Sequence, residues 1–189
     1  HLPEYIVAHD IELPEGVGRD YVYQETERGV VGTAPEMDPF VVLPEDENGV
    51  TVKATLVNHA PVFPAFAYRF DTPDGSIVIS GDTSPSENLI KLAQGADVLV
   101  HEVLHQPSIE KLVPENVPNR DEQLYHIYSA HTASTAVGRV ARDANVKKLV
   151  LTHLVPADEI VPDEVWRDHA RAGFDGEVIV GKDLMEIGV

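Results

Sequence analysis

Apolar and polar residues alternate along several short stretches of the chain, the pattern of strands that bury one face. This alternation predicts strands over residues 50–57, 65–70, 76–80, 97–103, 147–154 and 176–180. Residues 71–76, DTPDGS, place Pro and Gly in turn positions between two of these strands. Strands 65–70 and 76–80 are therefore expected to pair as a hairpin.

Three other segments carry the signals of helices. Residues 133–144 place Ala and Val at spacings of three and four, which predicts the clearest helix of the chain. A short helix is predicted over 86–94 and another helix over 162–173, and the second has Pro near its start and Gly after its end. Residues 106–128 lack such a stripe and are predicted to be mostly loop with some helix. Strands and helices thus alternate, which predicts an α/β fold.

The first 49 residues differ from the rest in composition and periodicity. They are rich in Pro, Glu and Gly, and the first fifty residues contain twelve Asp or Glu against two Arg. We expect residues 1–189 to form part of a single domain, in which 1–49 is a variable, acidic segment and 50–189 carries the regular elements.

Overall composition narrows the possible partners and cofactors. The formal net charge of −18 repels phosphate backbones, so nucleic acid is predicted to be an unlikely partner. No apolar run is long enough to cross a membrane, and no membrane role is predicted. Because the chain has no Cys, a transition metal would have to be bound by carboxylates and by some of the nine His.

Four predicted strands end in side chains that can bind a metal ion or move a proton. These ends are Asn58-His59, Gly81-Asp82-Thr83, His101-Glu102 and Thr152-His153. Taken singly, each has a structural reading, as a hydrogen-bonded His or as an Asp that caps a turn. Their recurrence at strand ends favours a metal-dependent hydrolase, because α/β proteins place their chemistry there and a carboxylate can bridge two metals.

Three stretches resemble a known family: HAPVFPAFAYRF, SGDTSPSENLIKLAQGADVLVHEV and HTASTAVGRVARDANVKKLVLTHLVP. From about Val50 to the C-terminus, the chain resembles the second half of metallo-β-lactamase-fold hydrolases of the ribonuclease Z-like branch. The resemblance implies an αββα sandwich to which this chain contributes mainly the C-terminal half. It also implies two bound divalent ions, of the zinc type.

The resemblance also implies roles for five residues of this sequence. His59 would bind the first zinc ion, Asp82 would bridge both ions, and His153 would complete the shell of the second. His131 would donate a proton near the leaving group, and Glu102 would orient His131. The residues that bind the substrate stay unidentified, and no role is assigned to the remaining histidines.

One part of the family pattern is absent from this chain. The metal-binding motif His-x-His-x-Asp-His, which the family carries in its N-terminal half, does not occur in the sequence. We expect a portion of a longer protein rather than a member that lost its metals, because such a member would have no reason to keep His59, Asp82, His153 and the donor His131 at the family spacing; the start at His1 is consistent with this. We therefore expect this chain alone to be neither stable nor active without the N-terminal half. The family also suggests a homodimer.

The predicted function is that of a binuclear zinc hydrolase in which metal-activated water attacks a small-molecule ester, lactone, phosphodiester or sulfate ester. Only 22 residues lie between His59 and Asp82, where tRNA-processing members carry an arm that clamps RNA. This short spacing and the acidic charge argue for a small-molecule substrate. Two alternatives remain: a ribonuclease Z-type endonuclease that processes tRNA 3′ ends, and a metal-free binding module on the same fold.

Overall fold

A seven-stranded mixed sheet organises the molecule in the computed structural model, which describes residues 10–17, 23–26, 29–32, 34–157 and 161–189. Within these residues the strands are β1 (Tyr23–Thr26), β2 (Gly29–Gly32), β3 (Phe40–Leu43), β4 (Thr51–Leu56), β5 (Phe66–Thr72), β6 (Gly75–Ile79), β7 (Val98–Leu104), β8 (Lys148–Val155) and β9 (Glu177–Val180). The helices are α1 (Glu87–Leu92), α2 (Gln106–Leu112), α3 (Arg120–Ala130), α4 (Ser134–Asp143) and α5 (Asp163–Arg171).

The order of the large sheet follows the order of the chain, from β3 at one edge to β9 at the other. Strands β3 to β6 pair antiparallel, and the predicted hairpin is confirmed as β5 and β6, with Thr72 opposite Gly75. Strands β6 to β9 pair parallel, so each of their connections must cross over the sheet. The carboxyl ends of β6, β7 and β8 consequently meet at one edge.

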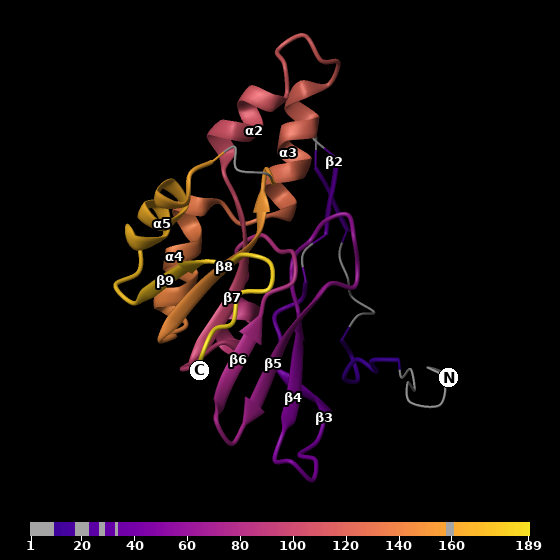
Figure 1. Ribbon diagram of the computed structural model, residues 1–189. Coiled ribbons are helices and arrows are strands. Elements are labelled where there is room, and N and C mark those ends of the chain that lie inside the picture. The colour runs from indigo at the N-terminus through magenta and orange to yellow at the C-terminus, as the bar shows by residue number, and fades with distance from the viewer. Residues whose placement is uncertain (1–9, 18–22, 27–28, 33, 158–160) are drawn as a thin grey trace, which may run out of the picture.

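Helices α1, α4 and α5 cover one face of the sheet and enclose the main core (Figure 1). Val78, Leu99, Leu149 and Val178 lie side by side across four strands and all belong to this core. The predicted helix stripe of α4 packs there too, with Val137 buried. Burial of this kind contributes about 25 cal/mol for each Å² of apolar surface removed from water.

The opposite face of the sheet is covered less completely. Tyr68, Ile79 and Val100 lie in one row across β5, β6 and β7, and Ile79 is 42% exposed. The C-terminal tail crosses this face in front of β7 and β8 (Figure 1), where Met185 and Ile187 line a cavity with Val100. Helices therefore cover one face of the large sheet, and the other face remains partly open.

Two segments differ from the prediction. The mostly loop structure predicted for residues 106–128 is wrong, because α2 and α3 occupy much of this segment and project beyond the sheet (Figure 1). Of α3 only Leu124 and Ala130 are buried, which explains the missing apolar stripe. In addition, β3 extends the large sheet into the acidic segment 1–49. No helix among the described residues is long and apolar enough to cross a membrane.

Candidate metal centre

Asp82, His131 and His153 meet at the edge where the parallel strands end. Asp82 follows β6, His153 lies in β8, and His131 follows α3. One ligand atom from each of the three lies within 4.8 Å of the other two. His153 Nε2 is 3.6 Å from Asp82 Oδ2, and the rings of His131 and His153 stack with their centroids 5.6 Å apart. The fold therefore brings together residues that are far apart in the sequence.

The turn that presents Asp82 is held mainly by its neighbour Thr83. Thr83 is fully buried, and its N–H points to Glu102 Oε1 at 3.4 Å. The Thr83 hydroxyl accepts a hydrogen bond from the N–H of Asn58 at 3.1 Å. The backbone carbonyl of Thr83 accepts one from Thr132 Oγ1 at 2.7 Å. Thr83 thus joins three loops, while the half-buried carboxylate of Asp82 lies beside His153.

His131 and Glu102 form the pair that the sequence analysis expected. His131 Nδ1 lies 3.2 Å from Glu102 Oε2, and Glu102 is only 1% exposed. The other carboxylate oxygen, Oε1, accepts a hydrogen bond from the N–H of Thr132 at 2.7 Å. The hydrogen bond to Glu102 raises the pKa of His131 above its usual value, against the opposing effect of burial. The pair is thus arranged to keep a proton on His131.

His59 lies beside this group of three rather than within it. Its ring centroid is 5.3 Å from that of His131. His59 Nδ1 is 3.1 Å from the carbonyl oxygen of Ala130, and because a carbonyl only accepts, Nδ1 must donate. The lone pair of His59 is then on Nε2, which is the arrangement typical of a metal-binding His.

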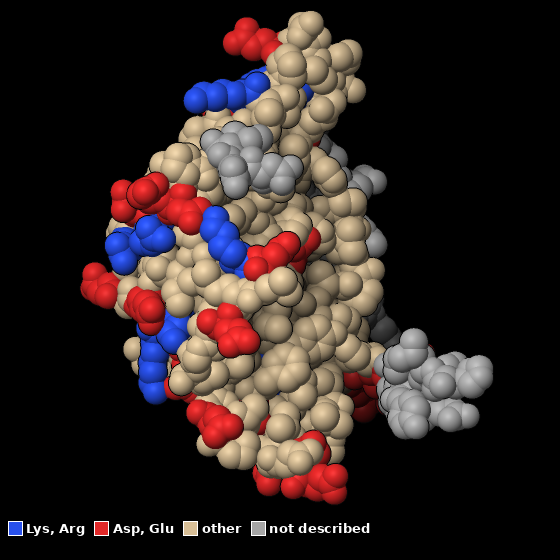
Figure 2. Space-filling model, viewed as in Figure 1, with Lys and Arg blue, Asp and Glu red and all other residues tan. Residues whose placement is uncertain are grey.

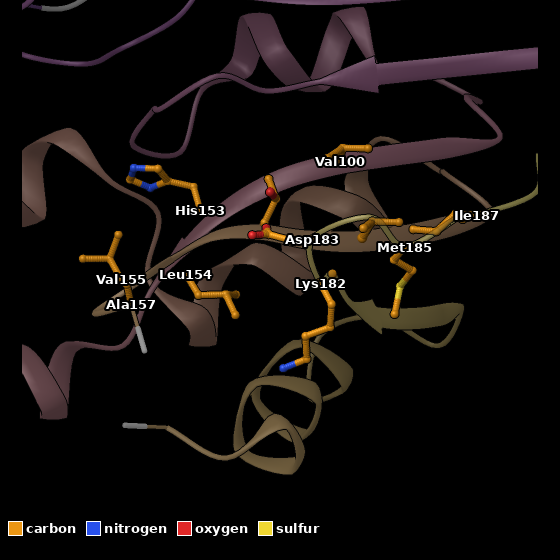
Figure 3. A pocket seen from close by; sticks show the side chains of 12 residues that line it. Val100, His153, Leu154, Val155, Ala157, Lys182, Asp183, Met185 and Ile187 are labelled. Atoms are coloured by element: carbon orange, nitrogen blue, oxygen red, sulfur yellow. The ribbon is translucent and has the colours of Figure 1, made fainter. Parts of the chain in front are cut away.

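His153 occupies an irregular position in its strand. The pairing register of β7 and β8 shifts there, since Glu102 lies opposite Thr152 whereas Val103 lies opposite Leu154. His153 is the additional residue of this β-bulge and has a φ of 41°. It also forms one end of a cavity of about 680 Å³, and Figure 3 shows its ring turned away from Lys182. The bulge therefore directs His153 towards Asp82.

The donor set fits a divalent cation. Asp82 and His153 offer the oxygen and nitrogen ligands that borderline metals such as zinc prefer, and their ligand atoms lie within 4.8 Å of each other and of His131. Glu102 holds the neighbouring His131 through the 3.2 Å contact between Oε2 and Nδ1. The sequence analysis singled out Asp82 and His153 as metal ligands and, through the family resemblance, His131 as a proton donor, but it assigned no supporting role to Thr83.

Comparison with known proteins assigns the family. No family model matches the sequence. The chain is 34% identical over 175 residues to a Mycobacterium tuberculosis protein named putative ribonuclease Z. This match covers 91% of the present chain and 75% of the relative. A second relative from that species, named ribonuclease Z, is also 34% identical, and the chain spans 62% of its length.

Two solved structures share the fold. The metallo-β-lactamase fold protein YhfI from Bacillus subtilis has a TM-score of 0.54 and 23% identity, over 76% of this chain and 50% of that one. The short form of human tRNase Z has a TM-score of 0.50 and 21% identity, over 78% of this chain and 44% of that one. At these identities the likeness concerns the fold, and it confirms the predicted metallo-β-lactamase architecture.

These relatives also correct one prediction. The prediction of a small-molecule substrate, with nucleic acid an unlikely partner, is wrong, because the relatives that match 91% of the chain are named as ribonucleases. The net charge of the chain was a poor guide, since it does not report the local field at a site. With the fold and the long sequence match in agreement, the chain belongs to the ribonuclease Z family of metallo-β-lactamase-fold hydrolases.

Proposed function

We propose that this chain provides part of the active site of a ribonuclease Z-type endonuclease, which hydrolyses a phosphodiester bond at the 3′ side of a tRNA precursor. The carrying observation is that Asp82, His131 and His153 converge in a chain that is 34% identical to proteins named ribonuclease Z. The name of a structural neighbour, the short form of human tRNase Z, supports tRNA as the class of RNA.

We further propose that His59, Asp82 and His153 hold two zinc ions, with Asp82 between them. A carboxylate has two oxygens and can bind two cations, which an imidazole cannot do. The His59 Nδ1 hydrogen bond to Ala130 leaves Nε2 available, which supports His59 as a ligand. When bound, the ions would supply Lewis acidity that activates water and offsets negative charge on the phosphate.

His131 fits the role of proton donor better than that of a metal ligand. A metal-binding His must give up the proton at its donor atom, whereas Glu102 raises the pKa of His131 and favours the protonated ring. Protonated His131 can pass a proton to the leaving oxygen of the RNA chain. Glu102 keeps the ring in one orientation through its 3.2 Å contact with Nδ1.

Cleavage of a tRNA precursor with a 3′ trailer by the whole protein tests this function. Asp82→Ala is expected to abolish cleavage and to reduce the zinc content, because the bridging carboxylate is lost. Asp74→Ala is the matched control, since Asp74 is an exposed carboxylate at the opposite end of β6. Unchanged cleavage by the Asp82 variant, or failure of the zinc-loaded protein to cleave the precursor, would refute the proposal.

A further inference from the structure

His101 is a buried imidazole that the proposed chemistry does not use. It lies in β7 opposite Leu151 and is fully buried. Its side chain is on the same face of the strand as those of Leu99 and Val103, which belong to the core. Its Nδ1 is 2.6 Å from the carbonyl oxygen of Glu102, the next residue along the chain. Because the carbonyl can only accept, Nδ1 carries the proton, and Nε2 is an acceptor.

The other nitrogen of His101 is left unsatisfied. Among the described residues, Nε2 has no hydrogen-bond partner although it is buried. An unpaired buried polar atom destabilises the folded protein, so an apolar residue would suit this core position better. Burial also lowers the pKa of His101, which keeps the ring neutral and the single Nδ1 proton in place. The Nδ1 hydrogen bond is thus the feature that distinguishes His101 from a Leu.

This hydrogen bond lies at the β-bulge of the candidate centre. The register shift falls between Glu102 and Val103, and its additional residue on the partner strand is His153. The N–H of Glu102 donates to Ser80 Oγ at 3.1 Å, so the peptide groups on both sides of the Glu102 Cα are anchored by side chains. The side chain of Glu102 then contacts His131 from this fixed backbone.

We propose that His101 is a positioning residue, whose Nδ1 hydrogen bond to the Glu102 carbonyl fixes the bulge that aims Glu102 at His131 and His153 at Asp82. This inference rests on the proposed metal site. Without the bond the Glu102 peptide group can rotate, and the bulge can shift along β8. Since a metal site tolerates little displacement of its ligands, the affinity for the cation falls.

His101→Asn and His101→Leu form a matched pair that isolates the hydrogen bond. Asn and Leu have the same number of side-chain heavy atoms and the same branching, and they leave the same cavity. Only Asn keeps an N–H donor two bonds from Cβ, at the position of Nδ1. The whole protein and both variants would be titrated with cobalt(II), whose visible absorption reports ligand geometry, and each unfolding midpoint would be measured without metal.

The expected orders of metal affinity and stability are opposite. His101→Leu should bind cobalt about tenfold more weakly than wild type, because the β-bulge that carries the proposed ligand His153 loses its anchor, and loss of an outer supporting contact commonly costs about 10–100-fold in metal affinity. His101→Asn should bind within about threefold of wild type, yet unfold at a lower temperature than the Leu variant because it buries an unpaired amide oxygen.

Three results would overturn the inference. If both variants bind cobalt as wild type does, His101 only fills the core. If both lose affinity in proportion to their loss of stability, the effect is structural and not positional. If wild type itself binds no cobalt at Asp82 and His153, then the proposed metal site fails and the inference fails with it.

Discussion

The backbone turn before Asp82 depends on a glycine. Gly81 has a φ of 59°, and a Cβ there would lie 2.7 Å from the carbonyl oxygen of Phe66. Gly81→Ala therefore combines left-handed backbone strain with a steric clash and should displace Asp82. We expect metal-dependent cleavage to fall at least about tenfold, as measured with a tRNA precursor.

Gly95→Ala is the control for this substitution. Gly95 has a φ of 65°, but a Cβ there meets no atom within 4 Å. This variant should lose about 1–2 kcal/mol of unfolding free energy from strain alone and keep its activity. Equal activity of the two variants would show that the close approach to Phe66 does not position Asp82.

The Glu102–His131 pair predicts a pH effect. Glu102 raises the pKa of His131, and a general acid works at pH values below its own pKa. Glu102→Gln should therefore lower the pKa of His131 and move the alkaline limb of the kcat profile to lower pH. The measurement is kcat against pH for both proteins at saturating zinc. An alkaline limb that stays in place would assign it to another group.

The sequence allows much of this site to be predicted, but not its supports. Asp82 and His153 follow apolar runs, and strand ends of one parallel sheet meet, so their proximity could be expected. The pairing of His131 with Glu102 came from the family resemblance, because the 28 residues between them carry no periodic signal. The alternation of Leu99, His101 and Val103 was a usable sign that His101 faces the core.

At the scale of elements, Asp97 joins three segments at the far end of the sheet. Its carboxylate accepts hydrogen bonds from Ser76 N and Oγ, at 2.7 and 2.9 Å, and from Lys147 Nζ at 2.6 Å. The hydrogen bond from Lys147, with those from Ser76, holds the pKa of Asp97 well below its usual value. Ionised Asp97 therefore stabilises the junction of β6, β7 and β8.

Asp97→Asn should reveal this contribution through its pH dependence. The pKa of Asp97 is lower in the folded state than its unfolded value of about 3.9. Its contribution to the free energy of unfolding is therefore complete above about pH 3.9 and is lost as the pH falls below that value. The variant should thus unfold at a lower temperature between about pH 5 and 7, and the difference should narrow below about pH 3.9. Thermal melts across this range make the test. A constant difference would exclude the charge of Asp97 as the cause.

Elements with a strong local pattern were predictable, and those without one were not. The hairpin of β5 and β6 has both alternation and turn residues, and α4 has an apolar stripe. Helix α3 buries two residues in eleven, so its position depends on the small cluster it forms with α2 rather than on a periodic face. Tertiary contacts, which a single sequence does not display, determine such a helix.

At the scale of the whole molecule, a net charge of −18 is compatible with an RNA substrate. Several acidic side chains gather at the lower end of the view in Figure 2, where the β3–β4 and β5–β6 turns lie in Figure 1. The candidate centre lies at the other end of the strands, where β6, β7 and β8 end. Bound cations would add positive charge there. At physiological salt the field of an exposed charge is largely screened beyond about 8–10 Å, so the distant acidic side chains have little effect at the centre.

One face of the large sheet is left partly open, with Ile79 42% exposed. Tyr68, Ile79 and Val100 form a row on this face, and the helices that bury Val78 lie on the other side. Figure 2 shows a broad surface here with few charged side chains. We propose that a second sheet covers this face, as the αββα sandwich implied by the family resemblance requires.

The proposed metal site is tested most directly by the position of bound zinc in crystals of the whole protein, located by anomalous scattering at the zinc edge. Zinc density is expected within about 2.0–2.2 Å of an Asp82 oxygen and of a His153 nitrogen, with His131 near but unligated. Zinc bound at full occupancy elsewhere, with no density in contact with Asp82, would contradict it.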